Sequence, residues 1–562
     1  MAKHTIKYRP APEGVLKVIP LGGIGEIGKN MTAIEYGEDI IVIDVGSTFP
    51  GEDKPGIDLV IPLTTYLKDN RDRVRAFFVT HGHEDHIGGA PYILGAFPNA
   101  AVYATRLTCA LIESKLKEAR IHDVVDLHEV EPGETIITGV FAVEFIKVSH
   151  SIAGACALGI HTPVGVLVHS GDFKVDYTPI DGQMIDLQRL AALGQQGVRL
   201  LMCESTNVER PGFTMSEKKV GETFHSLFEK AEGRIIIAMF ASNVHRIQMV
   251  IDAAAKFNRR VCLVGHGMVT VSKLSAQLGY LNIPDGMLAK LEEIDRYKDS
   301  ELVILTTGSQ GEAASGLTRM AFGEHKKIDI RPSDTIVLSS TPIPGNEKSV
   351  AKVLNTLVKT GANVIYDALQ EVHVSGHARQ EELKLMHALV KPQCFIPVHG
   401  EYRHLFHHAK LAEALGENPK NIIIPELGQV IELTEHEIRR GGTVPAGEDL
   451  IDGLSVGDIN ENVLRDRRQL SGEGVIIIIL CFDRDYGTLI NRPEIICRGF
   501  VNVKENEQLI EGVRDVVDKL LNTRLYELTT TASIKQAIRD AVKKYLNDTA
   551  RRDPMIIPWI TE

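Results

Sequence analysis

The sequence predicts a multidomain α/β protein with a strand-rich first domain, an inserted domain of Rossmann-like alternation and a small α+β domain at the C-terminal end. Three observations predict this fold class. Short β-type runs open the chain too close together for helices to lie between them. Strands and helices alternate from about residue 216 onward. A strand and two amphipathic helices occupy the last part of the chain, whose 562 residues are enough for several domains.

The first domain begins with β-type runs that are separated by glycines or charged turns. The runs are VLKVIPLGG, MTAIEYG, DIIVIDVG and RAFFVTHG. An amphipathic helix, RLTCALIESKLKEARI, follows them, and then come the strands FAVEFIKVSH and GVLVHSGD. The later strands end in polar clusters, which makes their ends the place to search for functional residues.

The inserted domain alternates strands such as RIIIAMF and ELVILTTG with helices such as HRIQMVIDAAAKFN. This alternation favours a mainly parallel sheet covered by helices. Polar strand ends return in EVHVSGHA and QCFIPVHGEYRH, as though the chain re-enters the first domain, and RRGGTVPAGEDLIDGLSVGD has the composition of a linker. The expected parts are residues 1–215 and 367–440 for the first domain, 216–366 for the inserted domain, 441–461 for the linker and 462–562 for the C-terminal domain.

The composition argues against several classes of protein. No run of about 18 apolar residues is present and the start lacks the apolar core of a secretory signal, so we expect a cytoplasmic protein without a membrane span. The 7 cysteines are scattered and form no CxxC pair, which argues against a disulfide framework or a cysteine-bound zinc ion. The net charge is −12, so a polyanion would have to bind in a local basic groove.

The stretch GGIGEIGKN contains the GxGxxG pattern of dinucleotide-binding sites, and Asp44 follows at the end of a later β-type run. That fingerprint requires a helix directly after the glycines, whose N-terminus holds the pyrophosphate. The residues between Lys29 and Asp44 indicate a strand and a turn instead. We therefore interpret Gly23, Gly25 and Gly28 as backbone turn residues.

The most informative stretch is THGHEDHIGG, which directly follows an apolar run. It contains four metal-ligating residues, His81, His83, Asp85 and His86. Neutral imidazole and carboxylate suit zinc or manganese, and residues in a loop can converge on one point as those in a helix interior cannot. A single histidine is more often an ordinary polar residue, but this set is difficult to explain as solvated surface. It predicts a metal site.

One loop cannot complete the coordination of two ions, so a two-metal site requires ligands at other strand ends. The sequence provides candidates in KVSHS, HSGDF, PVHGE and IDVG, namely His150, Asp172, His399 and Asp44. Each alone has an ordinary alternative, such as a turn aspartate that caps backbone amides or a histidine packed on the surface. The joint pattern is much less expected by chance, and it favours a two-metal centre.

The HxHxDH motif, the later histidine and the aspartate of SGDF resemble the metallo-β-lactamase superfamily, whose fold is an αββα sandwich with the metals at its edge. Glu204 in CESTN, His377 in VSGHA and His399 in PVHGE resemble the three extra motifs of the β-CASP nucleases. Over nearly its whole length, including the C-terminal domain, the chain is similar to the bacterial ribonuclease J family. The motifs that carry this similarity are PLGGIGEIGKN, THGHEDHIGG, FASNVHR, TGSQGE, PIPGNE and SGHARQEE.

The resemblance implies two Zn²⁺ ions per subunit, with Mn²⁺ or Mg²⁺ as alternatives. It places His81, His83 and His150 on the first ion, Asp85, His86 and His399 on the second, and Asp172 between the two. Asp44 would lie behind the ligand loop and hold it by hydrogen bonds, as such sites require. The first extra motif of the family is usually an aspartate, whereas this chain has Glu204, so the orientation of that carboxylate stays open.

The resemblance also assigns proton transfer at the leaving 3′-oxygen to Glu204 and His377 as a coupled pair, with support of a ligand loop as the alternative role of His377. A terminal 5′-phosphate of the RNA would contact Ser242, Asn243, His373, Val374, Ser375, Gly376 and His377. The loop TTGSQGE offers further candidates for anion contacts, namely Gly308, Ser309 and Gln310. Small and hydroxyl residues at helix N-termini expose N–H groups to phosphate, although ordinary N-caps and turns explain each stretch about equally well.

A structural cation is a further implication of the resemblance. The loop FPGEDKPGID and the linker would supply oxygen atoms of Pro55, Ile57 and Asp452. Hard oxygen ligands suit Ca²⁺ or Mg²⁺. Pro55 and Ile57 could contribute only their carbonyl groups.

These implications predict a metal-dependent ribonuclease that degrades single-stranded RNA from the 5′ end, prefers 5′-monophosphate ends, has additional endonuclease activity and acts in rRNA and mRNA maturation and decay. The alternatives are a DNA nuclease of the same superfamily and a non-catalytic scaffold of an RNA-degradation complex. A flavodiiron-type oxidoreductase is disfavoured, because that group usually has a glutamate where His83 stands. By the same resemblance we expect a homodimer or homotetramer, with other RNA-degradation proteins as partners.

Overall fold

The computed structural model describes residues 14–51, 53–343, 345–453, 455–482, 489–501, 506–524 and 530–561. The chain divides into two compact units, of which the first comprises Met1–Thr48 with Val60–Asp449 and the second comprises Phe49–Leu59 with Leu450–Glu562. Within the described ranges, no helix is long and apolar enough to cross a membrane. The domain boundaries expected from the sequence are finer than this division and stay predictions.

The first unit contains two large sheets. The larger one has the strand order β22-β21-β1-β3-β4-β6-β7-β8, in which β1, β3 and β4 are antiparallel neighbours and β4, β6, β7 and β8 run parallel. Its strands are β1 (Leu16–Gly22), β3 (Met31–Tyr36), β4 (Asp39–Ile43), β6 (Val74–Phe78), β7 (Ala101–Thr105), β8 (Leu127–Val130), β21 (Gln429–Leu433) and β22 (Ile438–Thr443). Residues from both sides of the inserted segment therefore build one sheet, which agrees with the expected re-entry of the chain.

The smaller of these sheets has the order β19-β13-β12-β11-β10-β9. Strands β9 to β12 are antiparallel neighbours, and β12, β13 and β19 run parallel. The strands are β9 (Thr135–Thr138), β10 (Phe141–Lys147), β11 (Cys156–Thr162), β12 (Gly165–His169), β13 (Val198–Glu204) and β19 (Cys394–Val398). The ends of β12, β13 and β19 lead directly into the stretches that hold Asp172, Glu204 and His399.

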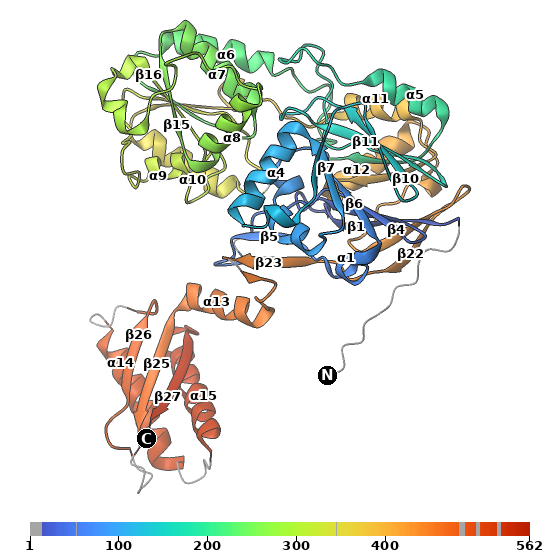
Figure 1. Cartoon of the computed structure of the whole chain (residues 1–562). Helices are drawn as coiled ribbons and strands as arrows, with labels where there is room; N and C mark the ends of the chain where they lie inside the picture. The colour runs from blue at the N-terminus through green and yellow to red at the C-terminus, as the bar shows by residue number, and fades with distance from the viewer. Residues whose placement is uncertain are drawn as a thin grey trace. The chain divides into compact units, whose positions relative to one another are not determined.

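The two sheets pack on one hydrophobic core. The ring centroids of Phe78 in β6 and Phe145 in β10 lie 6.1 Å apart, and both side chains belong to one buried cluster. Helices cover the outer faces, with α4 beside the larger sheet and α5, α11 and α12 beside the smaller one (Figure 1). This part of the chain has helices α1 (Thr65–Asp69), α2 (Glu84–Ile87), α3 (Ala90–Ile93), α4 (Arg106–Glu118), α5 (Leu187–Gln196), α11 (Gln380–Val390) and α12 (Tyr402–Ala414), the 3₁₀ turns η1 (Arg71–Arg73), η2 (Leu94–Ala96), η3 (His122–Val124) and η6 (Pro419–Asn421), and strand β5 (Leu59–Pro62). The layers confirm the predicted αββα sandwich.

The inserted segment forms a five-stranded, fully parallel sheet of order β15-β16-β14-β17-β18. Its strands are β14 (Ile235–Ala238), β15 (Arg260–Val264), β16 (Leu302–Thr306), β17 (Thr335–Leu338) and β18 (Asn363–Tyr366). The helical elements are α6 (Lys218–Lys230), α7 (Val244–Lys256), α8 (His266–Gln277), α9 (Gly316–Ala321), α10 (Glu347–Lys359), η4 (Leu291–Arg296) and η5 (Asp299–Glu301). The predicted Rossmann-like alternation is confirmed.

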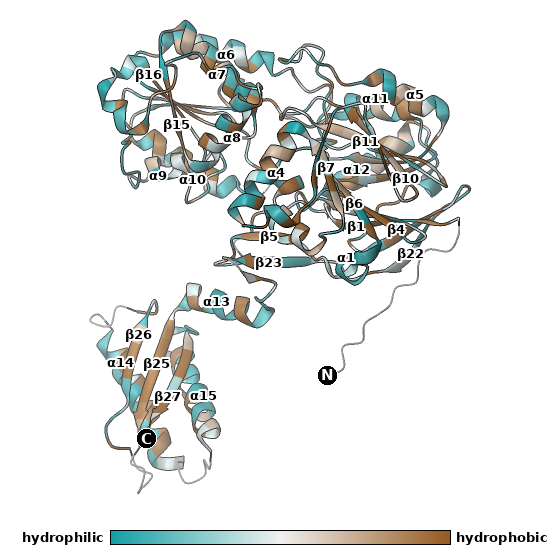
Figure 2. Cartoon of the chain, in the orientation of Figure 1, coloured by the Kyte–Doolittle hydropathy of each residue, from teal (hydrophilic) through white to brown (hydrophobic). Residues whose placement is uncertain are grey.

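The second unit contains a three-stranded sheet of order β26-β25-β27. Residues Ile476 and Ile478 of β25 pack in one buried cluster with Val513 of α14 and Val542 of α15, and Figure 2 shows the hydrophobic character of β25 and β27. The elements are β23 (Glu448–Asp452), β24 (Ser455–Val456), α13 (Glu461–Glu473), β25 (Val475–Cys481), β26 (Glu494–Arg498), α14 (Glu507–Arg524), α15 (Thr531–Ala550) and β27 (Met555–Thr561). This arrangement confirms the predicted small α+β domain.

The glycine-rich stretch near the start of the chain is a turn. All three glycines of the GxGxxG pattern have positive φ angles, between 73° and 100°. The short strand β2 (Ile24–Gly25) pairs with β20 (Gly400–Glu401), and the strand β3 follows where a dinucleotide-binding protein would have a helix. The backbone-turn interpretation is confirmed, and the Gly23 carbonyl oxygen accepts a 2.9 Å hydrogen bond from the N–H of His399.

Candidate metal centre

The ligand loop lies between strand β6 and the single-turn helix α2. His81 and His83 are in the loop, and Asp85 and His86 are in the first turn of the helix. The backbone bends sharply here, and the Ser47 amide donates to the Glu84 carbonyl oxygen, which ties the helix to the segment after β4. This local structure brings four imidazole and carboxylate groups from a stretch of six residues into the candidate ligand groups.

His81, His83 and His150 direct three ring nitrogens towards one point. The Nδ1 atom of His83 lies 3.1 Å from the Nε2 atom of His81 and 3.1 Å from the Nε2 atom of His150. Two nitrogens on one tetrahedral zinc ion would be about 3.3 Å apart, because each Zn–N bond is about 2.0–2.1 Å. Burial lowers the pKa of His83 to about 4 and the pKa values of His81 and His150 well below the ordinary value. The three rings are therefore neutral at pH 7, which is the form that binds metal.

The second group of metal-ligating side chains consists of Asp85, His86, Asp172 and His399. The Nε2 atom of His399 lies 3.2 Å from Oδ2 of Asp85, and its Nδ1 atom lies 2.9 Å from Oδ1 of Asp172. The other carboxylate oxygen of Asp172, Oδ2, lies 3.6 Å from Nε2 of His81 and 3.9 Å from Nε2 of His150. Asp172 thus faces both groups of ligands.

The second group is more strongly charged than the first. Burial alone would lower the pKa values of His86 and His399, but the carboxylates of Asp172 and Asp85 outweigh it, so that the pKa of His86 lies well above its ordinary value and that of His399 is about 10. Burial would raise the pKa of Asp172, yet the same histidines hold this pKa well below its ordinary value. A divalent cation that binds here competes with the protons of these histidines, because metal ligands must be deprotonated.

The donor set of the two groups fits a metal ion. Two buried atoms, Nε2 of His399 and Oδ2 of Asp172, lie 3.2 Å from charged neighbours but form no hydrogen bond of normal geometry with any described residue. An unsatisfied buried polar group costs about 1–3 kcal/mol, and coordination of a cation would satisfy both atoms. The donors are imidazole nitrogens and carboxylate oxygens without any cysteine, a combination that suits zinc or manganese.

Strained backbone and buried hydrogen bonds hold the candidate metal ligands in position. Asp44 and His399 have φ angles of 61° and 53°, a left-handed conformation that is uncommon for residues other than glycine and is often found at functional sites. The carboxylate of Asp44 accepts a 2.8 Å hydrogen bond from the N–H of Thr80 and lies 2.7 Å from Nδ1 of His86. A proton on that Nδ1 leaves Nε2 of His86 unprotonated, which is the form that binds a metal. This is the supporting position that the resemblance implied for Asp44.

Glu204 and His377 form a pair beside the second group. The Nδ1 atom of His377 lies 2.9 Å from Oε2 of Glu204, and it lies 3.7 Å from Oδ2 of Asp172. Glu204 is fully buried, and its Oε1 accepts hydrogen bonds from the N–H groups of Phe173 and Ala378. The longer side chain of glutamate therefore reaches His377. Glu204 and His377 also form a third group of possible metal ligands with Asp172 and His399.

The candidate phosphate-binding residues lie in two loops. Asn243 caps helix α7, since its Oδ1 accepts a 3.1 Å hydrogen bond from the N–H of Arg246. In the other loop, the Ser375 hydroxyl accepts a 2.8 Å hydrogen bond from Nδ2 of Asn207. The Gly376 carbonyl oxygen lies 2.8 Å from Nδ1 of His150. This last contact links the second loop directly to a candidate metal ligand.

The remaining candidates have more ordinary surroundings. Ser242 is half-buried before the start of α7, and Nδ1 of His373 lies 3.4 Å from the hydroxyl of Thr341. Gln310 is buried, and its side-chain amide is engaged within the chain by Thr341 and by the N–H of Ile343. Ser309 is buried beside it, and Gly308 has a φ angle of 107°. The TTGSQGE loop therefore stabilises the inserted domain through Gln310.

We expect the replacement of Gly376 by alanine to weaken metal binding at His81, His83 and His150. A Cβ atom at Gly376 would lie only 2.6 Å from Cε1 of His150, so the imidazole ring would have to move. Loss of the support behind a metal-ligating histidine typically costs about 10–100-fold in affinity. Competition with a chelating dye measures the change. Gly267→Ala is the matched control, because a Cβ atom there meets nothing within 4 Å, and equal metal affinity in the two variants would contradict the expectation.

The residues expected to hold a structural cation lie within the second unit, and a side chain already engages them. The guanidinium group of Arg467 in α13 donates hydrogen bonds to the carbonyl oxygens of Pro55 and Gly56 and to the carboxylate of Asp452. No contact of Ile57 with this group is present among the described residues; its N–H donates to the Lys54 carbonyl oxygen. The positive charge next to these oxygen atoms comes from the chain itself, and an additional cation at this position stays a prediction.

Replacement of Arg467 by alanine should lower the midpoint of thermal unfolding of the second unit by about 4 °C. The reason is the loss of the partly exposed ion pair with Asp452, which contributes about 1 kcal/mol to the free energy of unfolding. Scanning calorimetry with EGTA or with Ca²⁺ measures it. In the unchanged chain, the midpoint should be the same in both solutions. Arg468→Ala, on the same helix, is the control, and a calcium-dependent midpoint in the unchanged chain would support the cation hypothesis.

Several residues that contact the candidate ligands belong to no motif, so the sequence alone does not identify them. Nδ2 of Asn30 lies 3.1 Å from Nε2 of His86, and the hydroxyl of Thr80 lies 3.0 Å from Nδ1 of His81. Asn207 donates to Ser375, as described above. Thr80 directly precedes the ligand loop and Asn30 ends the glycine-rich stretch, so their closeness to known motifs was the only available signal.

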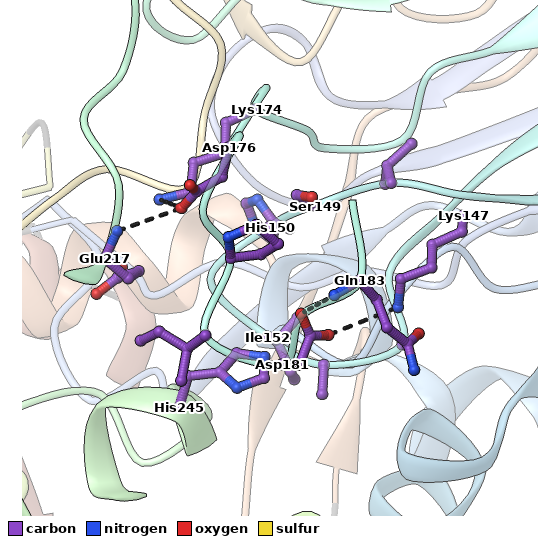
Figure 3. A pocket seen from close by; sticks show the side chains of 15 residues that line it. Lys147, Ser149, His150, Ile152, Lys174, Asp176, Asp181, Gln183, Glu217 and His245 are labelled. Carbon is purple, nitrogen blue, oxygen red and sulfur yellow. Dashed lines mark hydrogen bonds and ion pairs between the residues drawn. The ribbon is translucent and has the colours of Figure 1, made fainter. Parts of the chain in front are cut away.

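A small cavity lies beside His150 (Figure 3). Its lining combines polar and apolar residues, and the polar ones include Lys147, Ser149, Lys174 and His245. The volume of about 30 Å³ accommodates about two water molecules.

Comparisons with known proteins agree with the geometry. Four family models match successive parts of the chain. They are the metallo-beta-lactamase superfamily at residues 24–182, the beta-CASP domain of ribonuclease J at 232–357, the Zn-dependent metallo-hydrolase RNA specificity domain at 362–425 and the ribonuclease J C-terminal domain at 462–562.

Full-length relatives are similar over almost the entire chain. Ribonuclease J of Synechocystis sp. is 42% identical over 98% of this chain and 85% of its own length. Ribonuclease J2 of Bacillus subtilis is 43% identical over 97% of this chain and 98% of its own length. Ribonuclease J of Thermus thermophilus is 42% identical over 98% of this chain and 96% of its own length. A crystal structure of a protein of unknown function from Enterococcus faecalis covers 75% of this chain and all of its own with a TM-score of 0.52 and 18% identity, which shows a likeness of fold alone. The chain belongs to the ribonuclease J family and is a metal-dependent nuclease of the β-CASP group within the metallo-β-lactamase superfamily.

Proposed function

We propose that the chain is a two-metal ribonuclease that hydrolyses RNA phosphodiesters. It works as a 5′-to-3′ exonuclease that prefers 5′-monophosphate ends, has additional endonuclease activity and serves in rRNA and mRNA maturation and decay. One observation supports the proposal most strongly. Asp172 contacts both groups of metal-ligating side chains and lies beside the pair of Glu204 and His377. The names of the relatives and the match to an RNA specificity domain support RNA as the substrate.

The chain would bind one ion through His81, His83 and His150 and the other through Asp85, His86 and His399, with Asp172 between them. Two divalent ions held by these residues, zinc or else manganese or magnesium, would supply a hydroxide near neutral pH and would stabilise charge on the attacked phosphoryl oxygens. The leaving 3′-oxygen needs a proton. His377 can donate it as a general acid, because its partner Glu204 favours the protonated imidazole.

The preference for a 5′-monophosphate would come from Ser242, Asn243 and the loop formed by residues 373–377. The hydroxyl of Ser375 and the backbone N–H groups of this loop are the donors for a terminal phosphate. The Gly376 carbonyl oxygen contacts His150, so a phosphate held by this loop lies near the metal centre. Cleavage close to the 5′ end is the expected consequence.

A time course on three RNAs that differ only at the 5′ end tests the proposal. The RNAs carry a monophosphate, a triphosphate or a hydroxyl, and each is incubated with Zn²⁺, with Mn²⁺ or with EDTA. Release of mononucleotides that is fastest from the monophosphate and absent in EDTA supports the proposal. Shortening from the 3′ end, or equal rates on all three RNAs, would contradict the proposed polarity or preference.

The same assay separates the alternatives. Faster cleavage of a DNA oligonucleotide of matched sequence would favour a DNA nuclease. RNA binding without cleavage, by a chain that holds no divalent ion and gains no activity from Zn²⁺ or Mn²⁺, would favour a scaffold. Association as a homodimer or homotetramer and with other RNA-degradation proteins also stays a prediction, and light scattering of the purified chain measures the first of these.

A further inference from the structure

Helix α7 carries a completely buried arginine. Arg246 follows the candidate phosphate-binding residues Ser242 and Asn243 by one turn of helix, and only 1% of its surface is exposed. A guanidinium group is charged at any physiological pH, so its burial requires a full set of hydrogen-bond acceptors. The acceptors that Arg246 uses come from three different segments of the chain.

Each nitrogen of the guanidinium group has a partner. Nε and Nη2 donate to the carboxylate of Glu217, at 3.3 Å and 2.8 Å, and Nη1 donates to the Ser339 carbonyl oxygen at 2.8 Å. Nη2 also donates to the Val374 carbonyl oxygen at 3.2 Å. Because these bonds engage all three nitrogens, Arg246 acts on its neighbours and is not itself a contact for phosphate.

These bonds join the two loops that would hold a terminal phosphate. Val374 belongs to the loop of Ser375 and Gly376, and the hydroxyl of Ser339 supports this loop again by a 2.6 Å hydrogen bond to the Val372 carbonyl oxygen. At the other end, the N–H of Arg246 is capped by the side chain of Asn243. One residue therefore fixes the loop after β18 relative to the start of α7.

The same network reaches the segment of the bridging aspartate. Glu217, the partner of Arg246, is buried, and its N–H donates to Oδ2 of Asp176 at 3.3 Å. Asp176 lies four residues after Asp172 in the loop that follows β12. The position of the phosphate loop is thus coupled, through one buried ion pair, to the loop that carries a candidate metal ligand.

We propose that Arg246 is the positioning residue that sets the preference of this enzyme for a 5′-phosphate. It does so by holding Val374, Ser375 and Gly376 at a fixed position relative to Asn243. Hydrogen-bond donors from the two loops can then contact the same phosphate group. The inference rests on the proposed function, because it presupposes a preference for 5′-monophosphate ends.

Arg246→Lys tests the proposal, because lysine keeps the charge but lacks the planar fork that reaches three partners at once. The matched control is Arg234→Lys. Arg234 is a buried arginine of the same domain that is paired with the carboxylate of Asp334, at 2.9 Å and 2.7 Å, and it contacts neither phosphate loop. Ser339→Ala is a milder second variant that removes one hydroxyl from the same support.

The measurement is the ratio of kcat/KM on 5′-monophosphate RNA to that on 5′-hydroxyl RNA of the same sequence. Misplacement of a binding group by about 1 Å can cost about a hundredfold, so we expect Arg246→Lys to lower the ratio at least tenfold, mainly through KM of the monophosphate substrate. Ser339→Ala should lower it less, and Arg234→Lys should leave it unchanged.

An unchanged ratio in both Arg246→Lys and Ser339→Ala would overturn the inference, as would an equal fall of the ratio in Arg234→Lys. If Arg246→Lys fails to fold, the ratio of Ser339→Ala decides. A ratio near one in the unsubstituted enzyme would contradict the proposed function itself, and this result is distinguishable because it appears before any substitution is made.

Discussion

Replacement of Asp172 by asparagine is expected to lower RNA cleavage by about three to four orders of magnitude while the fold persists. Asp172 is buried, and its two oxygens face ring nitrogens of both metal-ligating groups, at 2.9 Å for His399, 3.2 Å for His86 and 3.6 Å for His81. Asparagine has nearly the same shape but no charge. It therefore removes the negative charge that lies between the two groups of metal-ligating side chains and leaves a poorer ligand for a metal ion bound there.

Metal analysis and cleavage of 5′-monophosphate RNA check this expectation together. Asp181→Asn is the control, since Asp181 is an exposed aspartate a few residues further along the chain whose ion pair with Lys147 lies outside the metal centre. Normal circular dichroism of Asp172→Asn, with less bound metal and almost no cleavage, is the expected result. Full metal content and undiminished cleavage in that variant would show that Asp172 does not bridge the ions.

The convergence of the candidate metal ligands could be predicted to a large extent because these residues occur in patterns. Four of them fall within one loop, and His150, Asp172 and His399 each follow a β-type run. Ends of neighbouring strands meet at one edge of a sheet, so the pattern alone implied that the side chains converge. The structure brings all seven of these side chains within reach of two points.

The supporting contacts could not be predicted, because each joins single residues that are far apart in the sequence. Arg246 reaches Val374, which is 128 positions away, and Arg467 reaches Gly56, which is 411 positions away. A lone arginine in a helical stretch has no recognisable spacing, and its usual place is the surface. Only the packing of the inserted domain shows that Arg246 is buried and that its partners come from the site.

The surroundings of the predicted structural cation could not be read from the sequence for a related reason, and the cation itself stays a prediction. The resemblance gave the oxygen atoms at Pro55 and Asp452 as ligands, and these two groups do lie close to one positive charge. That charge is the guanidinium group of Arg467, 15 positions after Asp452 in the sequence. A motif shows which acceptors a site offers, whereas the occupant of the site depends on side chains outside the motif.

The second large effect concerns the pair of Glu204 and His377. Burial would lower the pKa of His377, but the neighbouring carboxylates of Glu204 and Asp172 outweigh it and raise this pKa above its ordinary value. A raised pKa keeps the imidazole protonated to a higher pH than that of an ordinary histidine, and the proton is lost as the pH rises through the raised pKa. Cleavage that needs His377 as an acid should therefore decline on the alkaline side of the pH profile.

Replacement of Glu204 by glutamine should move this decline to lower pH and reduce cleavage at pH 8 by about a hundredfold, with a smaller loss near pH 6. Glutamine retains a hydrogen-bond acceptor for the N–H groups of Phe173 and Ala378 but removes the charge that holds the proton on His377. The profile of kcat/KM against pH, measured on one 5′-monophosphate RNA, gives both the shift and the loss.

A double-mutant cycle shows whether the two residues act as one unit. His377→Ala removes the acid, so a further change at Glu204 should have little effect in that background, and the combined loss should be far smaller than the product of the single losses. His128→Ala, at a partly exposed histidine paired with Asp126, controls for the loss of an imidazole elsewhere. Two results would contradict this expectation: a loss in the double variant equal to the product of the single losses, or a pH profile of Glu204→Gln whose alkaline decline is not shifted. Either result would mean that the proton comes from another donor and that Glu204 acts directly at the metal centre, where it belongs to the third group of possible ligands.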